Sequence, residues 1–149
     1  MSITLEEARR LLDRAVEHAA TIGVPSSVAV VDVGGHVVVK ARMDGAPLVT
    51  VRMCEDKAYT AVAVGEPTAN LLPDAQPGAP LFGLFAAEGG RMIVFGGGYP
   101  LFVEDRLVGG LGIAGGTVEQ DLEIGDVALA EWAALQGGDR HPHDSQEDE

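Results

Sequence analysis

A glycine-rich apolar run near the end of the chain constrains the fold most. Residues 107–114 read Leu-Val-Gly-Gly-Leu-Gly-Ile-Ala, and Gly110, Gly112 and Gly115 have the spacing of a dinucleotide-binding loop. Such a loop follows a strand, opens a helix and is followed by further β-α units. Here only one helix-like segment follows, so we expect no nucleotide cofactor. The glycines suit the close approach of a helix, a second subunit or a ligand to a bare strand, and the residues leave these alternatives open.

Apolar spacing divides the chain into helices and strands. Two capping boxes, Thr4 with Glu7 and Thr117 with Gln120, predict the starts of the first and last helices. Short helices are also predicted at residues 68–72 and 82–87, and a glycine-rich turn at 96–100. The long helices are predicted at residues 5–21, 48–64 and 117–135, and the strands at 27–33, 36–42, 91–95, 101–104 and 107–114.

Short turns between these strands predict an α+β fold with a five-stranded antiparallel sheet flanked by helices. The length suits one domain, which we place at residues 1–137. Residues 138–149 carry several acids and almost no apolar side chain, which predicts a disordered acidic tail.

Charge excludes several classes of partner. The chain has 23 Asp and Glu against 10 Lys and Arg, a formal net charge of −13. A nucleic-acid or anionic-membrane partner needs a basic face, so neither is expected. The chain shows no secretory signal pattern and no membrane-length apolar run, which predicts a cytoplasmic protein.

Two glycine-rich turns are candidate ligand-binding segments. Gly97, Gly98 and Tyr99 form a flexible turn that suits a pocket rim, with a mobile loop as the alternative. The free amides of Gly115, Gly116 and Thr117 precede a capped helix and suit an anion, with tight packing as the alternative.

Charged side chains supply candidate catalytic groups. Lys57 falls outside the polar stripe of its helix, so it either serves a site as an acid-base group or forms an ion pair with a residue such as Asp44. Arg42 can hold a carboxylate, while Asp44 is either catalytic or a turn residue. Glu88 is a further candidate for proton transfer, and His36 for ligand binding. No motif indicates a metal site.

Five segments together resemble the GlcG/HbpS-like family, which includes the C-terminal domains of PduO-type proteins and is labelled haem-degrading or haem-binding. The resemblance implies profilin-like α-β-α layers, assembly into homodimers or larger oligomers, and ligand pockets near subunit contacts. Ala114 stands where the family often has serine, which removes a hydroxyl beside the expected pocket, and Asp105-Arg106 replaces a usual glycine turn. The segments are residues 31–36, 42–46, 57–61, 97–100 and 109–121.

Two functions follow as hypotheses. The first is a small-ligand-binding protein for haem or a related tetrapyrrole, with His36, His18, Tyr99 and Thr117 as candidate ligands. The second is a cofactor-independent isomerase, lyase or hydrolase acting on a small carboxylate- or carbonyl-bearing metabolite. In that enzyme Lys57, Asp44 or Glu88 would move the proton, while Arg42 and the glycine amides would hold the anion. An accessory protein without chemistry is the third alternative.

Overall fold

The structure, a computed structural model, describes residues 1–138. Four antiparallel strands form one sheet in the order β2-β1-β4-β3, so β2 and β3 are its edges. Ser27 lies opposite Arg42 on one side and Ala114 on the other, while Gly98 lies opposite Gly112. The strands are β1 (Ser27–Asp32), β2 (Val37–Arg42), β3 (Gly98–Val103) and β4 (Arg106–Ala114).

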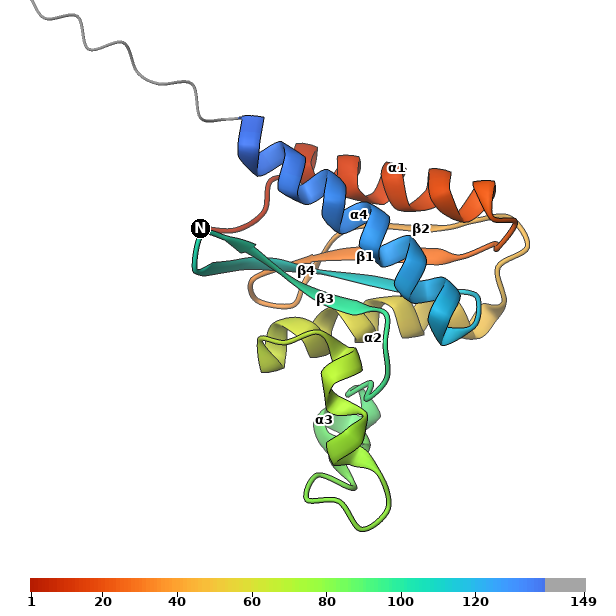
Figure 1. Cartoon of the computed structure of the whole chain (residues 1–149), viewed down its shortest axis with the longest axis vertical. Helices are drawn as coiled ribbons and strands as arrows, with labels where there is room; N and C mark the ends of the chain where they lie inside the picture. Colours follow the sequence, from red (N-terminus) through yellow and green to blue (C-terminus); the bar gives the residue numbers. More distant parts are fainter. Residues whose placement is uncertain (139–149) are drawn as a thin grey trace, which may run out of the picture.

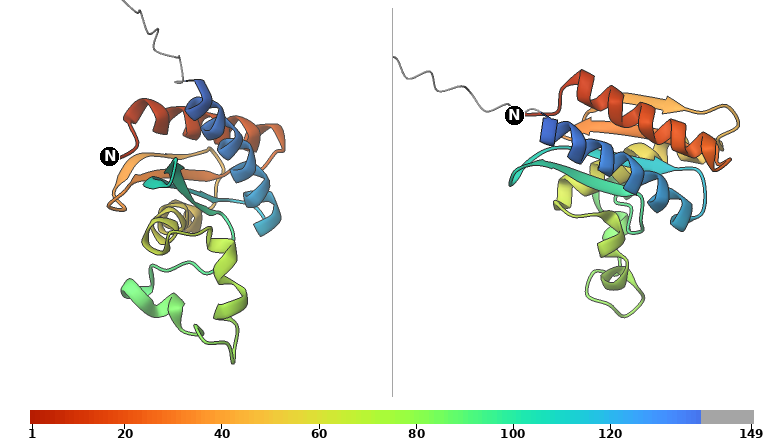
Figure 2. Two further views of the ribbon diagram at one scale, coloured as in Figure 1. Left: turned by 60° about the vertical axis from the view of Figure 1, so that its left-hand side comes forward. Right: turned by 45° about the horizontal axis from the view of Figure 1, so that its top comes forward.

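Helices cover both faces of this sheet. Helices α1 (Leu5–Thr21) and α4 (Val118–Gly138) lie side by side on one face, and α2 (Leu48–Val64) lies on the other (Figures 1 and 2). The three layers agree with the predicted α+β arrangement of helices on an antiparallel sheet.

The local signals set the helix ends. Thr4 and Glu7 form the predicted capping box at the start of α1. At the start of α4, the Thr117 amide donates to Gln120 Oε1 at 2.9 Å and the Gln120 amide donates to Thr117 Oγ1 at 3.2 Å. Helix α2 has the bounds that the apolar spacing predicts and ends at Gly65, which adopts the left-handed conformation (φ 74°).

The two faces of the sheet bury different side chains. The face under α1 and α4 carries the main apolar core, where the Trp132 indole also donates to the Phe102 carbonyl at 3.0 Å. The face under α2 is lined by small residues, including Ala29 and Ala114, so this helix lies close to the sheet. The large buried side chains of the main core include Leu11, Val28, Val30, Leu101, Leu111, Ile113 and Ile124.

A long excursion, here called the arm (residues 66–95), joins α2 to β3. It extends away from the sheet on the side of α2 (Figure 1). It contains only short helical turns, which are η1 (Thr68–Leu71), η2 (Pro73–Ala75), η3 (Leu84–Ala86) and α3 (Ala87–Gly90).

The prediction of five strands was wrong, because residues 91–95 pair with no strand. The Ile93 amide donates instead to Thr60 Oγ1 on α2 at 2.9 Å. Residues 98–100, predicted as part of a turn, are the first residues of β3.

The predicted acidic tail lies outside the described residues, apart from Gly138 at the end of α4. Within residues 1–138, no helix is long and apolar enough to cross a membrane.

Candidate functional site

Lys57 is the largest fully buried side chain, at 1% exposure, and it lies on the sheet-facing side of α2. Its Nζ donates to the Ile113 carbonyl at 2.8 Å and to Asp121 Oδ2 at 2.9 Å. The same nitrogen lies 5.3 Å from the centroid of the Phe95 ring. The amine is therefore surrounded by groups of its own chain.

Asp121, the partner of Lys57, belongs to the first turn of α4 and is 3% exposed. Its second oxygen, Oδ1, accepts the Gly116 amide hydrogen at 3.0 Å. The positive end of the helix dipole also favours a carboxylate at this position. The ion pair thus ties α2 to the end of β4 and to the start of α4.

Burial lowers the pKa of the Lys57 amine below its usual value, while the charge and hydrogen bond of Asp121 act in the opposite direction. A lowered pKa suits a lysine that acts as a base, but such a base must also reach a substrate. In this chain the amine is fully enclosed. Asp44, the predicted ion-pair partner, is exposed, and Asp121 takes its place.

Gly98 of β3 and Gly110 and Gly112 of β4 are bare because α2 lies against them. A Cβ at Gly112 would overlap the Cys54 carbonyl oxygen, and one at Gly98 would overlap the Lys57 carbonyl oxygen. A Cβ at Gly110 would lie 2.7 Å from the Ala58 carbonyl oxygen. Of the alternatives for these glycines, close approach of a helix is the one that the single chain shows.

Three of the backbone amides predicted to bind an anion already have acceptors within the chain. Gly98 donates to Thr68 Oγ1 at 2.9 Å, Gly116 donates to Asp121, and Thr117 donates to Gln120. Gly97 adopts a left-handed conformation (φ 123°) beside Lys57, and Gly115 packs against the Pro25 carbonyl. These segments do meet around Lys57, but the amides of Gly98, Gly116 and Thr117 are used in holding the fold together.

Tyr99 lies in the core and not on a pocket rim. It is 5% exposed, its ring packs against Gly125, and its hydroxyl donates to the Leu122 carbonyl at 3.3 Å. Burial raises the pKa of this phenol above its usual value. A tyrosine that is enclosed and protonated in this way is a poor ligand for iron.

The remaining predicted catalytic and anion-binding groups lie away from Lys57. Arg42 Nε and Nη2 both donate to the Ala46 carbonyl, at 3.0 and 2.8 Å, and Arg42 is separated from Ala114 by β1. Asp44 is exposed in the turn that follows β2. Glu88 is exposed on the arm, where it accepts the Tyr59 hydroxyl at 3.3 Å. The structure therefore brings no second acid-base group from this set to the lysine.

Of the predicted haem ligands, His36 is the accessible imidazole. It is exposed at the end of the β1–β2 turn, and its backbone amide donates to Asp32 Oδ1 at 3.0 Å. Val33 and Val37 at the two ends of the turn are 44% and 42% exposed. An imidazole beside exposed apolar side chains fits the needs of a haem group, which combines an iron with a large apolar plate.

The other candidate ligands are less available. His18 Nε2 is buried without a hydrogen-bond partner among the described residues and lies 3.5 Å from Glu123 Oε1. Thr117 Oγ1 accepts the Gln120 amide hydrogen. Cys54 was not among the predicted ligands. Burial raises the pKa of its thiol to about 11, which keeps it protonated at neutral pH. Within residues 1–138, no group of three or more His, Cys, Asp or Glu side chains is placed to hold a metal ion.

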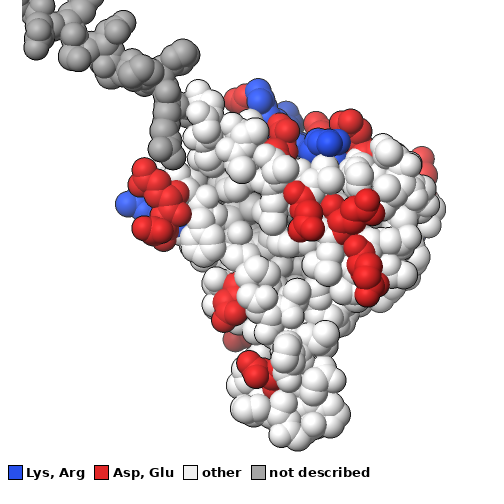
Figure 3. All heavy atoms as spheres, viewed as in Figure 1, with Lys and Arg blue, Asp and Glu red and all other residues white. Residues whose placement is uncertain are grey.

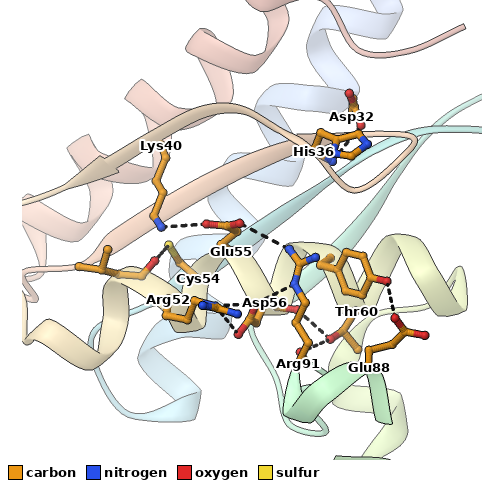
Figure 4. A network of polar contacts seen from close by, with 12 residues as sticks. Asp32, His36, Lys40, Arg52, Cys54, Glu55, Asp56, Thr60, Glu88 and Arg91 are labelled. Carbon is orange, nitrogen blue, oxygen red and sulfur yellow. Dashed lines mark hydrogen bonds and ion pairs between the residues drawn. The ribbon is translucent and has the colours of Figure 1, made fainter.

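A polar network on α2 was missed in the sequence. Glu55 pairs with Lys40 at 3.0 Å, and Asp56 lies 3.4 Å from Arg52 (Figure 4). Arg91 of the arm reaches both carboxylates. The helical spacing did predict a polar stripe on this helix that includes Glu55 and Asp56, and this stripe was the available signal for the network. Nothing in the sequence connects the stripe with Arg91.

A surface hollow lies beside the N-terminal residues and the β3–β4 turn, at the end of the sheet that also carries the β1–β2 turn. It has a volume of about 370 Å³ and contains none of the predicted site residues. It is lined by Met1, Ser2, Ile3, Thr4, Glu7, Val103, Glu104, Val108 and Gln136.

A family model described as haem degrading protein HbpS-like matches residues 3–130. The chain belongs to the HbpS-like family. The corrinoid adenosyltransferase PduO of Citrobacter freundii is 43% identical over 130 residues, which make up 87% of this chain and 39% of that protein. The chain thus spans about two fifths of the length of this curated relative.

Solved structures share the fold of this HbpS-like chain. The crystal structure of Klebsiella pneumoniae protein ORFY has a TM-score of 0.87 at 34% identity, over 89% of this chain and 92% of that one. The crystal structure of a PduOC:heme complex has a TM-score of 0.84 at 42% identity, over 87% of this chain and 94% of that one. The resemblance found in the sequence is confirmed.

Proposed function

We propose that this HbpS-like chain binds haem or a related tetrapyrrole and is not an enzyme that uses Lys57. The observation that carries the proposal is the likeness to PduOC, which was solved as a complex with haem and is 42% identical. The structure of Lys57 supports the same choice, because its amine is enclosed and paired with Asp121.

We further propose His36 as the side chain that holds the iron. Tyr99 is enclosed, Thr117 caps a helix, and Nε2 of His18 is buried. Of the two histidines, His36 is the one with an exposed side chain, and it lies beside the exposed Val33 and Val37. In this proposal the haem binds at the β1–β2 turn and not against Gly110 and Gly112 of β4, which α2 covers.

Titration with haemin tests this function. Absorbance in the Soret region is expected to change with each addition and to level off at one haem per chain. His36→Ala is expected to weaken binding tenfold or more, because an axial ligand is lost. His18→Ala is the matched control and is expected to titrate like the wild type.

Two results would contradict the proposal. If the haemin spectrum does not change in the presence of the wild-type chain, the proposal that the chain binds haem is contradicted. If His36→Ala binds haemin with wild-type affinity and His18→Ala binds it more weakly, the chain binds haem but His18, not His36, is the ligand.

We also propose that two or more copies associate through the outer part of the arm (residues 72–87). Leu72, Leu81, Phe82 and Phe85 are each between 44% and 52% exposed, and the two rings pack edge to face at 6.0 Å. Asp74 is the single charged residue of this part, in a chain with a net charge of −13. The arm is accordingly mostly free of charged side chains in Figure 3. Apolar, nearly uncharged surfaces of two copies can meet without the repulsion that the rest of the surface produces.

The double substitution Phe82→Ser/Phe85→Ser tests this contact. We expect the dissociation constant of the assembly to rise about 100-fold or more, because burial of one phenylalanine contributes roughly 1.5–3 kcal/mol. Sedimentation velocity over a concentration series measures the change. Leu5→Ser, which removes a comparably exposed apolar side chain from α1, is the control and is expected to leave association unchanged. An equal dissociation constant for wild type and the double variant would exclude the arm as the contact.

A further inference from the structure

The returning end of the arm is fastened to α2 through Arg91. Its Nε donates to Asp56 Oδ1 at 2.9 Å, and its Nη2 lies 3.5 Å from Glu55 Oε1. Its guanidinium carbon lies 3.7 Å from the centroid of the Tyr59 ring, which is the distance of a stacked cation–π contact. Figure 4 shows Arg91 directed at the two carboxylates. We call Arg91 with Glu55, Asp56 and Tyr59 the latch.

Two further contacts join the same stretch of the arm to α2. The Tyr59 hydroxyl donates to Glu88 Oε2 at 3.3 Å, and the Ile93 amide donates to Thr60 Oγ1 at 2.9 Å. Met92 is the buried apolar residue between them, at 5% exposure. Of these contacts, the ion pairs of Arg91 respond to salt. The Arg91 and Glu55 side chains are 25% and 27% exposed, so ions in solution weaken their attraction, though less than they would weaken a fully exposed pair.

The backbone just before Arg91 bends through three left-handed residues. Glu88, Gly89 and Gly90 have φ values of 53°, 69° and 85°. A left-handed glutamate is disfavoured and persists only where its surroundings hold it. A Cβ built on Gly89 or Gly90 would meet no atom within 4 Å, so packing does not fix this bend. The contacts of the latch, which follow at once in the chain, are what hold it.

The other end of the arm is fastened separately. Thr68 is buried and its hydroxyl accepts the Gly98 amide hydrogen, and Leu71 is 7% exposed. Opening of the latch would leave this end in place, so the outer part of the arm would turn about it.

We propose that the latch is an ion-sensitive switch that sets the direction of the arm. Closed, it holds the arm in the position shown in Figure 1, and with it the outer part that carries the exposed Phe82 and Phe85. High ionic strength opens the latch by screening Arg91 from its carboxylates, and the bend at residues 88–90 then relaxes. This proposal does not depend on haem binding or on self-association.

Amide hydrogen exchange, followed by NMR at low protein concentration, tests the switch in the full chain. Between 0.1 and 1 M NaCl, the Ile93 amide and the Arg91 Nε–H are expected to exchange at least fivefold faster, while the amides of β4 keep their rates. Arg91→Met preserves the length of the side chain but removes its charge. At 0.1 M NaCl this variant is expected to show the fast exchange at Ile93 and no further response to salt.

Arg14→Met removes a comparable arginine from an ion pair on α1, that with Glu17 at 3.4 Å, and controls for loss of charge alone. It is expected to leave the salt response of the arm intact. Exchange at Ile93 that does not change with salt in the wild type would overturn the proposal, whether or not Arg91→Met folds. Equal acceleration in β4 would overturn it as well, because the whole fold would then be loosening.

Discussion

Lys57→Met is expected to lower the free energy of unfolding of the chain by about 3–5 kcal/mol. Methionine fills the same space but leaves the Asp121 carboxylate buried at 3% exposure without its counter-charge. Removing one partner of a buried ion pair costs about 3–5 kcal/mol, a large part of the roughly 5–15 kcal/mol that a domain possesses. The measurement is urea unfolding of the variant and the wild type at 25 °C, with circular dichroism as the signal.

A double variant separates the ion pair from general damage to the core. Lys57→Met/Asp121→Leu removes both charges, so we expect it to be more stable than Lys57→Met alone. The same experiment distinguishes a structural lysine from a catalytic one. A Lys57→Met chain with wild-type stability would contradict the structural role and reopen the enzyme hypothesis.

Gly112→Ala is the second substitution with a large expected effect. The new methyl group would overlap the carbonyl oxygen of Cys54, which belongs to the backbone of α2. A side chain could rotate away, but here the helix itself must move from the sheet, and its contacts with β3 and β4 move with it. We expect a loss of about 3 kcal/mol or more, at or above the upper end for overpacked cores.

Gly137→Ala is the matched control for this substitution. Gly137 lies in α4, and a Cβ at this position would meet no atom within 4 Å. Alanine favours a helix over glycine by up to about 1 kcal/mol, so this variant is expected to be equally or slightly more stable. Thermal unfolding of the two variants side by side measures the difference. If Gly112→Ala has the same melting temperature as the wild type, the packing of α2 on the sheet does not require a glycine at this position.

Local signals in the sequence were sufficient for most of the elements. The capping residues Thr4 and Thr117 identified two helix starts, and Gly65 marked the end of α2. Residues 91–95 failed as a strand because strand formation depends on a partner, and Thr60 on α2 supplied the hydrogen bond instead. That contact joins residues far apart in the chain, so no local pattern reveals it.

The candidate site was predictable only in part for the same reason. The helical spacing placed Lys57 away from the polar stripe of α2, and the structure shows it buried. Its partner, Asp121, lies 64 residues further along the chain. The helix dipole alone explains an acid in the first turn of a helix, so Asp121 gave no sign that it pairs with a lysine. The accessibility of His36 and the enclosure of Tyr99 depend on how helices cover the sheet, which the individual residues do not encode.

The two edges of the sheet differ in their capacity to accept another strand. Edge strand β3 contains Pro100, which has no amide hydrogen for an incoming strand, whereas every residue of edge strand β2 keeps its amide. A sheet that continues through many copies needs both edges of each copy, because β2 of one copy must pair with β3 of the next. Joining β2 to β2 of a second copy instead closes on itself after two chains. The proline thus limits growth into fibres, a risk that an open four-stranded sheet otherwise carries at both sides.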